Sequence, residues 1–372
     1  MCSEAHTIKT SSKSTRSFVA AAMLLAMTLV SLSSPRADVT FLLEKEKGED
    51  KSSHELELSG RLYTLFWYRD EIEKPKNEIQ VEMARIQLKW KYKKRLQTEV
   101  SVDLDGIYDD SPHQLLRDAF VSYRFFRELR LRFGQFKRPF TWLETTSREA
   151  LPVIRRGAGN EFMIRDLGYG SRDVGVELFG LVGHDFEVEY ALGVFGGEGI
   201  RLDEQDLNGA KDVSGRIRVK PVDWLRVGGS FTVKMFDTGV RANVPDLAWA
   251  AAGELRLKFG DFRFQGEFIW GENWSLASRP DGFDVLGLAR YTWDIPGTKE
   301  MKLQPMFRLG LLVPDQGRMG ESKIWTYTPG VNWIVNKAFR LMVQGHIVRS
   351  GARTQFLFPD STGVMVQGAV DL

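Results

Sequence analysis

The chain has 372 residues, of which 43% are hydrophobic and 27% are charged, and 51 basic against 49 acidic side chains give a formal net charge of +2. A charge this close to zero identifies no nucleic-acid or other anionic partner, so only its distribution along the chain can do so. The single cysteine, Cys2, excludes disulfide bonds, cysteine metal sites and cysteine nucleophiles from everything after the N-terminus.

Residues 1–37 predict a secretory signal peptide. Three basic residues, Lys9, Lys13 and Arg16, precede the apolar run FVAAAMLLAMTLVSL, and small residues follow in SLSSPRA. The run is too short for the roughly 20 residues of a membrane-spanning helix, which favours export and cleavage near Ala37 over a membrane anchor. Cys2 is then lost with the signal, and residues 38–54 follow as a charged, solvated lead-in.

From residue 55 onward, apolar and polar side chains alternate with the two-residue period of β-strands. We count sixteen such segments. They fall at about residues 56–66, 84–92, 96–104, 119–125, 129–133, 174–178, 186–194, 213–219, 225–235, 247–259, 262–270, 283–293, 303–313, 325–335, 341–347 and 364–372.

The connectors between these segments alternate in length. Brief links such as KKR and GD take turns with long polar ones such as RDEIEKPKN and DTGVRANVPD. Short turns at one rim and long loops at the other, on an even number of strands, are typical of outer-membrane barrels. A soluble sandwich or propeller also alternates, but no four-strand unit repeats here. Residues 55–372 therefore predict an all-β fold, a transmembrane antiparallel barrel of about sixteen strands.

The stretch LRLRFGQFKRPF decides which face of the strands is wet. Outward-facing Arg130 and Arg132 would cost roughly 2–4 kcal/mol each in lipid, so both should face the lumen. The same test turns further cations inward and predicts a lumen that is polar and ionised throughout. Those singled out as pore-lining candidates are Arg85, Lys89, Arg218, Arg226, Arg256 and Arg308.

A long connector follows this stretch, from Lys137 to Arg172. We predict a structureless loop that folds inward and narrows the bore, because loops of this length in compact folds are usually functional. It holds seven basic residues against four acidic ones. The basic residues, which we predict to select the solute, are Lys137, Arg138, Arg148, Arg155, Arg156, Arg165 and Arg172.

GQFKRPF, TSREALPVIRR and GYGSRDVGVELFG resemble motifs of the phosphate-selective porin O and P family. The resemblance implies a sixteen-stranded barrel, commonly a homotrimer, that passes phosphate or other small anions by a constriction in the third outer loop. It carries basic character onto the motif positions Lys137, Arg138, Arg148, Arg155, Arg156 and Arg172. The sequence departs from the pattern at its last residue, Leu372, where an aromatic residue is common.

Together these features predict a porin in the outer membrane of a Gram-negative bacterium, embedded in a lipid bilayer and open to small anions. A general non-selective porin and a structural barrel plugged by its own loop are the alternatives. An outer-membrane hydrolase is a further one, but no histidine has an evident serine and acid partner set. No cofactor, metal ion or nucleic acid is predicted as a partner.

Overall fold

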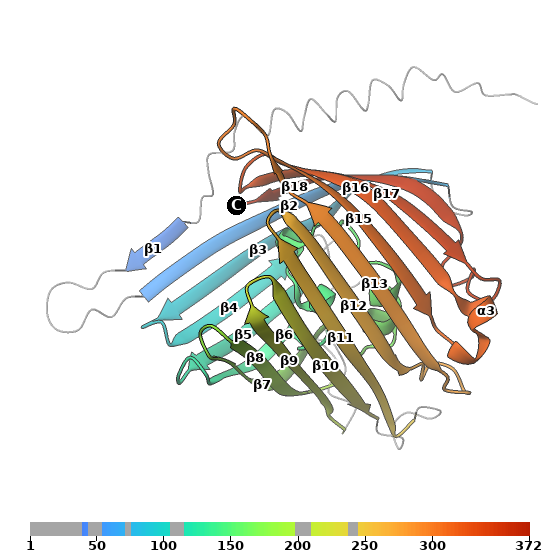
Figure 1. The fold of residues 1–372 in the computed structure, drawn as a ribbon. Coiled ribbons are helices and arrows are strands. Elements are labelled where there is room, and N and C mark those ends of the chain that lie inside the picture. The colour runs from blue at the N-terminus through green and yellow to red at the C-terminus, as the bar shows by residue number, and fades with distance from the viewer. Residues whose placement is uncertain (1–38, 44–53, 71–75, 105–114, 198–209, 237–244) are drawn as a thin grey trace, which may run out of the picture.

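The alternating segments form strands that pair antiparallel, each with the next along the chain (Figure 1). The computed structural model describes residues 39–43, 54–70, 76–104, 115–197, 210–236 and 245–372, so the predicted signal peptide lies outside the described residues. The last strand pairs with the first long strand, from Thr362 with Asp70 to Asp371 with Arg61. The predicted closed sixteen-stranded antiparallel barrel is therefore confirmed.

The barrel strands agree with the predicted segments. They are β2 (His54–Asp70), β3 (Asn77–Tyr92), β4 (Leu96–Asp103), β5 (Leu116–Arg124), β6 (Arg130–Lys137), β7 (Arg172–Val182), β8 (Glu187–Phe195), β9 (Asp212–Val222), β10 (Leu225–Met235), β11 (Leu247–Phe259), β12 (Phe262–Glu272), β13 (Asp281–Tyr291), β15 (Lys302–Val313), β16 (Ile324–Ile334), β17 (Phe339–Ser350) and β18 (Ser361–Asp371).

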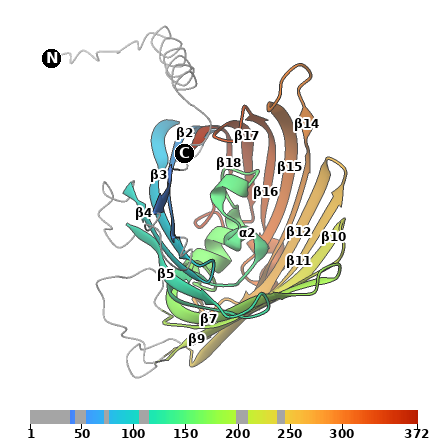
Figure 2. The same ribbon diagram turned by 90° about the vertical axis from the view of Figure 1, so that its left-hand side faces the viewer.

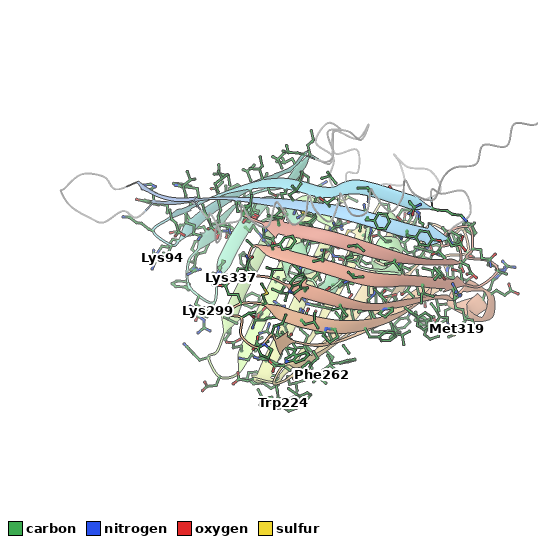
Figure 3. The ribbon with its side chains drawn as sticks, turned by 90° about the horizontal axis from the view of Figure 1, so that it is seen from above. Lys94, Trp224, Phe262, Lys299, Met319 and Lys337 are labelled. Carbon is green, nitrogen blue, oxygen red and sulfur yellow. The ribbon has the colours of Figure 1, made fainter. Side chains whose placement is uncertain are left out.

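Two short strands were not predicted. Residues 39–43 were expected in a solvated lead-in, but β1 (Val39–Leu43) pairs with the first residues of β2. The two-residue β14 (Trp293–Asp294) lies in the unusually long connector after β13 and pairs with β15. At the rim opposite the short turns, η5 (Gln316–Arg318) and α3 (Met319–Ser322) connect β15 to β16. Met319 lies at the opposite end of the barrel from Lys94 (Figure 3).

The predicted register places apolar side chains on the outer surface. Phe133, Val174 and Val176 are exposed there, whereas Arg132, the residue before Phe133 on β6, lines the interior. Aromatic residues such as Trp224 and Phe262 also project outward (Figure 3). In the described part of the chain, none of the helices has the length and apolar character to cross a membrane.

Residues 138–171 lie inside the ring of strands (Figure 2). This segment was expected to be structureless, but it contains three short helices: α2 (Trp142–Thr145), the 3-10 helix η3 (Arg148–Ala150) and the π-helix η4 (Asn160–Asp166). The correction has a physical cause. A backbone packed against a barrel wall has little access to water, so its N–H and C=O groups must find partners in helical turns or on the wall.

A packed apolar core fills part of the barrel interior, which corrects the expectation of a lumen that is ionised throughout. Phe162, Met163 and Ile164 of η4 are buried against inward side chains of β10 to β17, including Ile269 and Leu312. Around α2, Trp142 and Leu143 pack on β13 and β15. Residues 138–171 are thus fixed to the wall from β10 to β18, and the opposite wall remains uncovered.

Candidate functional site

The uncovered half of the interior is a cavity of about 1440 Å³ between residues 138–171 and strands β2 to β10. Its lining contains 16 arginines and lysines against nine aspartates and glutamates. Cations of this density along a confined aqueous path attract anions and repel cations. The arrangement can therefore conduct small solutes and favour negatively charged ones.

Twelve of the fifteen predicted site residues line this cavity. Those from the strands are Arg85, Lys89, Arg130, Arg132, Lys137, Arg172 and Arg218, and those from the inner segment are Arg138, Arg148, Arg155, Arg156 and Arg165. The structure thus brings residues from β3, β6, the inner segment, β7 and β9 to one surface.

Three predicted residues do not line the cavity. Arg308 is fully buried and donates hydrogen bonds to the carbonyl of Arg155 and, at 2.8 Å, to a threonine hydroxyl. Arg256 lies over the ring of Trp142, 4.8 Å from its centroid. Arg226 is the second residue of β10, and its guanidinium lies 3.8 Å from the Glu189 carboxylate. Arg308 and Arg256 support the inner segment because they lie on the wall that it covers.

Arg138 is also a structural residue, although it belongs to the predicted loop motif. Its side chain is 1% exposed and is bound to Asp173 on β7 and, at 2.7 Å, to Asp212 on β9. Lys234 on β10 approaches the same Asp212 carboxylate to 3.1 Å. A guanidinium held between two buried carboxylates is unavailable to a passing solute, so Arg138 fixes the start of the segment.

A β-bulge directs one acid at two loop arginines. In the pairing of β2 with β3, Tyr63 faces Met83 and the next residue faces Val81, which leaves Glu82 without a partner. The extra residue turns Glu82 into the cavity, where its carboxylate lies 3.0 Å from Arg148 Nη1 and 3.1 Å from Arg155 Nη2. One carboxylate therefore sets the positions of two cations of the inner segment.

Polar side chains of the covered wall bind the backbone of the segment. The Glu267 carboxylate accepts hydrogen bonds from the N–H groups of Trp142 and Leu143, at 2.7 and 2.9 Å. Arg340 donates to the carbonyls of Glu149 and Leu151, at 3.0 and 2.9 Å. These contacts satisfy backbone groups that short helices leave open at both ends.

Further along the segment, Gln344 accepts from the N–H of Ile154 at 3.0 Å and donates to the Pro152 carbonyl at 2.8 Å. A side chain at Gly159 would collide with the wall, because a Cβ there would lie 1.9 Å from the Cγ of Asp284. The segment consequently approaches the wall with its backbone at this point.

The C-terminal end of α2 is held by two predicted cations. Lys137 donates to the Glu144 carbonyl at 2.6 Å, and Arg156 donates to the Leu143 and Thr146 carbonyls, both at 3.0 Å. Burial would raise the pKa of the Glu144 carboxyl, but the charges of Arg156, Lys137 and Arg172 outweigh this effect and leave that pKa below its ordinary value. Glu144 is therefore a buried anion among cations.

The arginine row of β6 divides between two environments. Arg132 is bound to Glu177 and stacks near three phenylalanine rings, the closest being Phe136 at 4.1 Å from the guanidinium carbon. Arg130, two residues nearer the short-turn rim, forms no ion pair within the described part of the chain. Gly134 follows with φ +120, where a Cβ would lie 2.2 Å from the Ala119 carbonyl oxygen, so only glycine fits.

The set of predicted site residues omits some of the cavity lining. Arg61, Arg117, Arg216 and Lys234 all face the cavity. Arg61 alternates with the outward Leu62 on β2, so the same test that found Arg130 would have found it. Arg117 lies next to an irregularity in the pairing of β4 with β5, and a shift of this kind cannot be read from the period of the sequence.

The model of the phosphate-selective porin O and P family matches residues 66–199. This is somewhat over a third of the chain, and it includes residues 138–171 and most of the cavity lining. The match confirms the predicted resemblance. The comparison with curated proteins found no significant match.

Solved porin structures are similar to the whole barrel. OmpF of Salmonella typhi, in complex with daunomycin, aligns with a TM-score of 0.62 at 13% identity, over 86% of this chain and 98% of its own. An anion-selective porin from Comamonas acidovorans aligns with a TM-score of 0.58 at 11% identity, over 86% of this chain and 100% of its own. OmpT of Vibrio cholerae, in a trimer form, aligns with a TM-score of 0.56 at 12% identity, over 86% of this chain and 99% of its own. At these identities the likeness concerns the fold.

Proposed function

We propose that this chain, similar to phosphate-selective porin O and P proteins over residues 66–199, is an outer-membrane porin for small anions such as phosphate. The solute diffuses passively through the cavity between the inner segment and strands β2 to β10. The observation that carries this proposal is the lining of 16 cations against nine acids. The porin fold and the family match favour a non-enzymatic channel in the outer membrane of a Gram-negative bacterium.

Two alternatives make different electrical predictions. A general porin is favoured by the many ion pairs of the cavity, because paired cations such as Arg132 and Arg218 attract anions less strongly. A plugged structural barrel conducts nothing. A hydrolase is disfavoured by the surroundings of two described histidines, since His54 stacks on Trp90 and His346 contacts Trp67 edge-on.

The test is the zero-current potential of purified channels in a planar bilayer under a potassium chloride gradient, followed by addition of phosphate. We expect anion preference and partial block of the chloride current by phosphate. Replacing Arg148 and Arg155 with glutamine should lower both effects. Arg353→Gln, which removes an exposed cation outside the cavity lining, is the matched control. A wild-type channel without anion preference would leave a general porin, and absence of current would favour the plug. A preference that survives the double substitution would show that Arg148 and Arg155 do not select the solute.

The assembly and the export signal form part of the same proposal. A homotrimer is the assembly we propose, and light scattering of the detergent-solubilised protein should give three copies per particle. Cleavage near Ala37 should give a mature N-terminus at about residue 38, which N-terminal sequencing of protein from outer membranes would check. The proposed domains are then a signal peptide (1–37), a lead-in (38–54) and the barrel (55–372).

A further inference from the structure

The most concentrated positive charge outside the cavity lies on two neighbouring short turns. The β3–β4 turn carries Lys93, Lys94 and Arg95, and the β5–β6 turn contributes Arg124 and Arg127. The turns are adjacent, because the N–H of Arg124 donates to the Arg95 carbonyl at 2.7 Å. Arg130 follows directly at the start of β6. Five cations thus lie together at one place on the rim, next to Arg130, which faces the cavity.

Four of these cations are not paired with an acid in the part of the chain that the structure describes. Among the described residues, Lys94, Arg95, Arg124 and Arg127 form no ion pair, and Glu128 is the one acid within the two turns. The backbone of the β3–β4 turn is unusual as well, since Lys93 and Lys94 have φ of 48° and 55°. Tight hairpin turns with this geometry prefer asparagine and glycine, so lysine occurs here at a conformational cost.

Other turns on the same rim have a different character. The turns after β7, β9 and β11 each carry an aspartate, namely Asp185, Asp223 and Asp261. Lys299 and Lys337 lie on the same rim as Lys94 but in separate turns (Figure 3). The positive charge is therefore a local feature of the hairpins β3–β4 and β5–β6.

Exposed aromatic side chains adjoin the cations. Phe126, at the tip of the β5–β6 turn, is 67% exposed, and Phe125 packs edge-on against Tyr123 with 4.9 Å between ring centroids. Tyr92 stacks beside Trp90, and the Lys93 ammonium lies 5.5 Å from the Tyr92 ring. This surface therefore combines an apolar, outward-facing part with a cationic edge.

We propose that the two hairpins form a binding site for anionic phospholipid headgroups of the periplasmic leaflet. The inference rests on the proposed function, in which the short turns face the periplasm. Lysines and arginines at the membrane surface attract anionic lipid, and aromatic side chains favour the same depth. An acidic periplasmic protein would meet the same charges, but it would gain nothing from aromatic residues on the lipid-facing side of the strands.

The test is native mass spectrometry of the detergent-solubilised protein incubated with phosphatidylglycerol or, separately, phosphatidylcholine. We expect phosphatidylglycerol to be retained at least tenfold more than phosphatidylcholine. The triple variant Lys94→Gln, Arg95→Gln, Arg127→Gln should abolish this preference. The control, Lys299→Gln with Lys337→Gln, removes two exposed cations from the same rim and should retain it. Heat-modifiable gel mobility checks that each barrel is folded.

Equal retention of both lipids, or a preference that persists in the triple variant, would overturn the inference. Binding of poly-glutamate without binding of phosphatidylglycerol would also overturn it and would indicate an acidic protein partner. Phe126→Ala should weaken retention with no change in charge, as expected when ring and headgroup act together. Conductance in a phosphatidylcholine bilayer separates the two proposals. Channels without lipid preference refute this inference alone, and lipid preference without channels refutes the porin alone.

Discussion

Replacing Glu82 with glutamine should increase anion preference. The Glu82 carboxylate is 5% exposed and lies within 3.1 Å of two guanidinium groups, on Arg148 and Arg155, which are 24% and 27% exposed. Glutamine keeps the shape of the side chain but removes its charge. The cavity then has eight acids against 16 cations, and two arginines lose the partner that neutralised them.

The size of the effect follows from Coulomb's law. A unit charge about 8 Å from the solute in water contributes about 0.5 kcal/mol, which changes the concentration of a monovalent ion about twofold. The local concentration of anions rises and that of cations falls by the same factor. The ratio of anion to cation permeability should therefore rise about fivefold at low salt and less at physiological ionic strength. The lost bonds to charged groups should also weaken the hold on the segment by about 1.5–3 kcal/mol each before solvent screening.

The assay is the zero-current potential under a potassium chloride gradient. The control is Glu321→Gln, which removes the same charge from an exposed pair with Arg353 in the connection between β15 and β16. We expect the potential of the Glu82 variant to move toward the chloride limit and that of the control to stay unchanged. An unchanged or lower anion preference in the Glu82 variant would show that the two arginines do not face the permeating ion.

Arg138→Ala should destabilise the barrel by about 3–5 kcal/mol, because it leaves the buried Asp173 without its cation and Asp212 with Lys234 alone. Arg165→Ala should cost about 0.5 kcal/mol or less, and equal urea midpoints for the two variants would contradict this. Gly159→Ala should displace the inner segment and change single-channel conductance, whereas Gly320→Ala, with nothing within 4 Å, should not. Because the pKa of Glu144 is lowered, its stabilisation is present above its ordinary pKa and is lost as pH falls through the folded value. Glu144→Gln should therefore flatten the loss of stability below about pH 4.3, and an unchanged slope would count against the buried ion cluster.

The barrel could be predicted from sequence because lipid and water impose a two-residue period on every strand. The alternation of short and long connectors then predicted that each strand pairs antiparallel with the next along the chain. Five of the twelve site residues that line the cavity, Arg85, Lys89, Arg130, Arg132 and Arg218, followed from the same test, because a charged strand side chain avoids lipid on one face only. The other seven were predicted from the long connector. The inner segment was less predictable, because its short helices depend on wall partners such as Glu267 and Arg340 that are more than a hundred residues away.

The bulge at Glu82 shows why detail was lost. An extra residue inverts the alternation on one side of it, and the sequence contains no signal that marks where this occurs. The period alone assigns neighbours such as Glu82 and Met83 to opposite faces, yet both line the cavity. The partner that fixes Arg148 and Arg155 was therefore invisible before the register was known.

The position of the open path follows from where apolar residues face inward. Outward positions in lipid are apolar on every strand, so a strand with apolar residues at inward positions is apolar on both faces; β13, with Leu286 and Leu288, is an example. Such strands give the inner segment a surface to bury against. Strands β3 to β9 offer it arginines and acids instead, and covering an ion costs several kcal/mol unless every charge is paired. The inner segment therefore packs on the apolar wall. The water-filled passage remains beside the charged wall, where the cations can contact an anion.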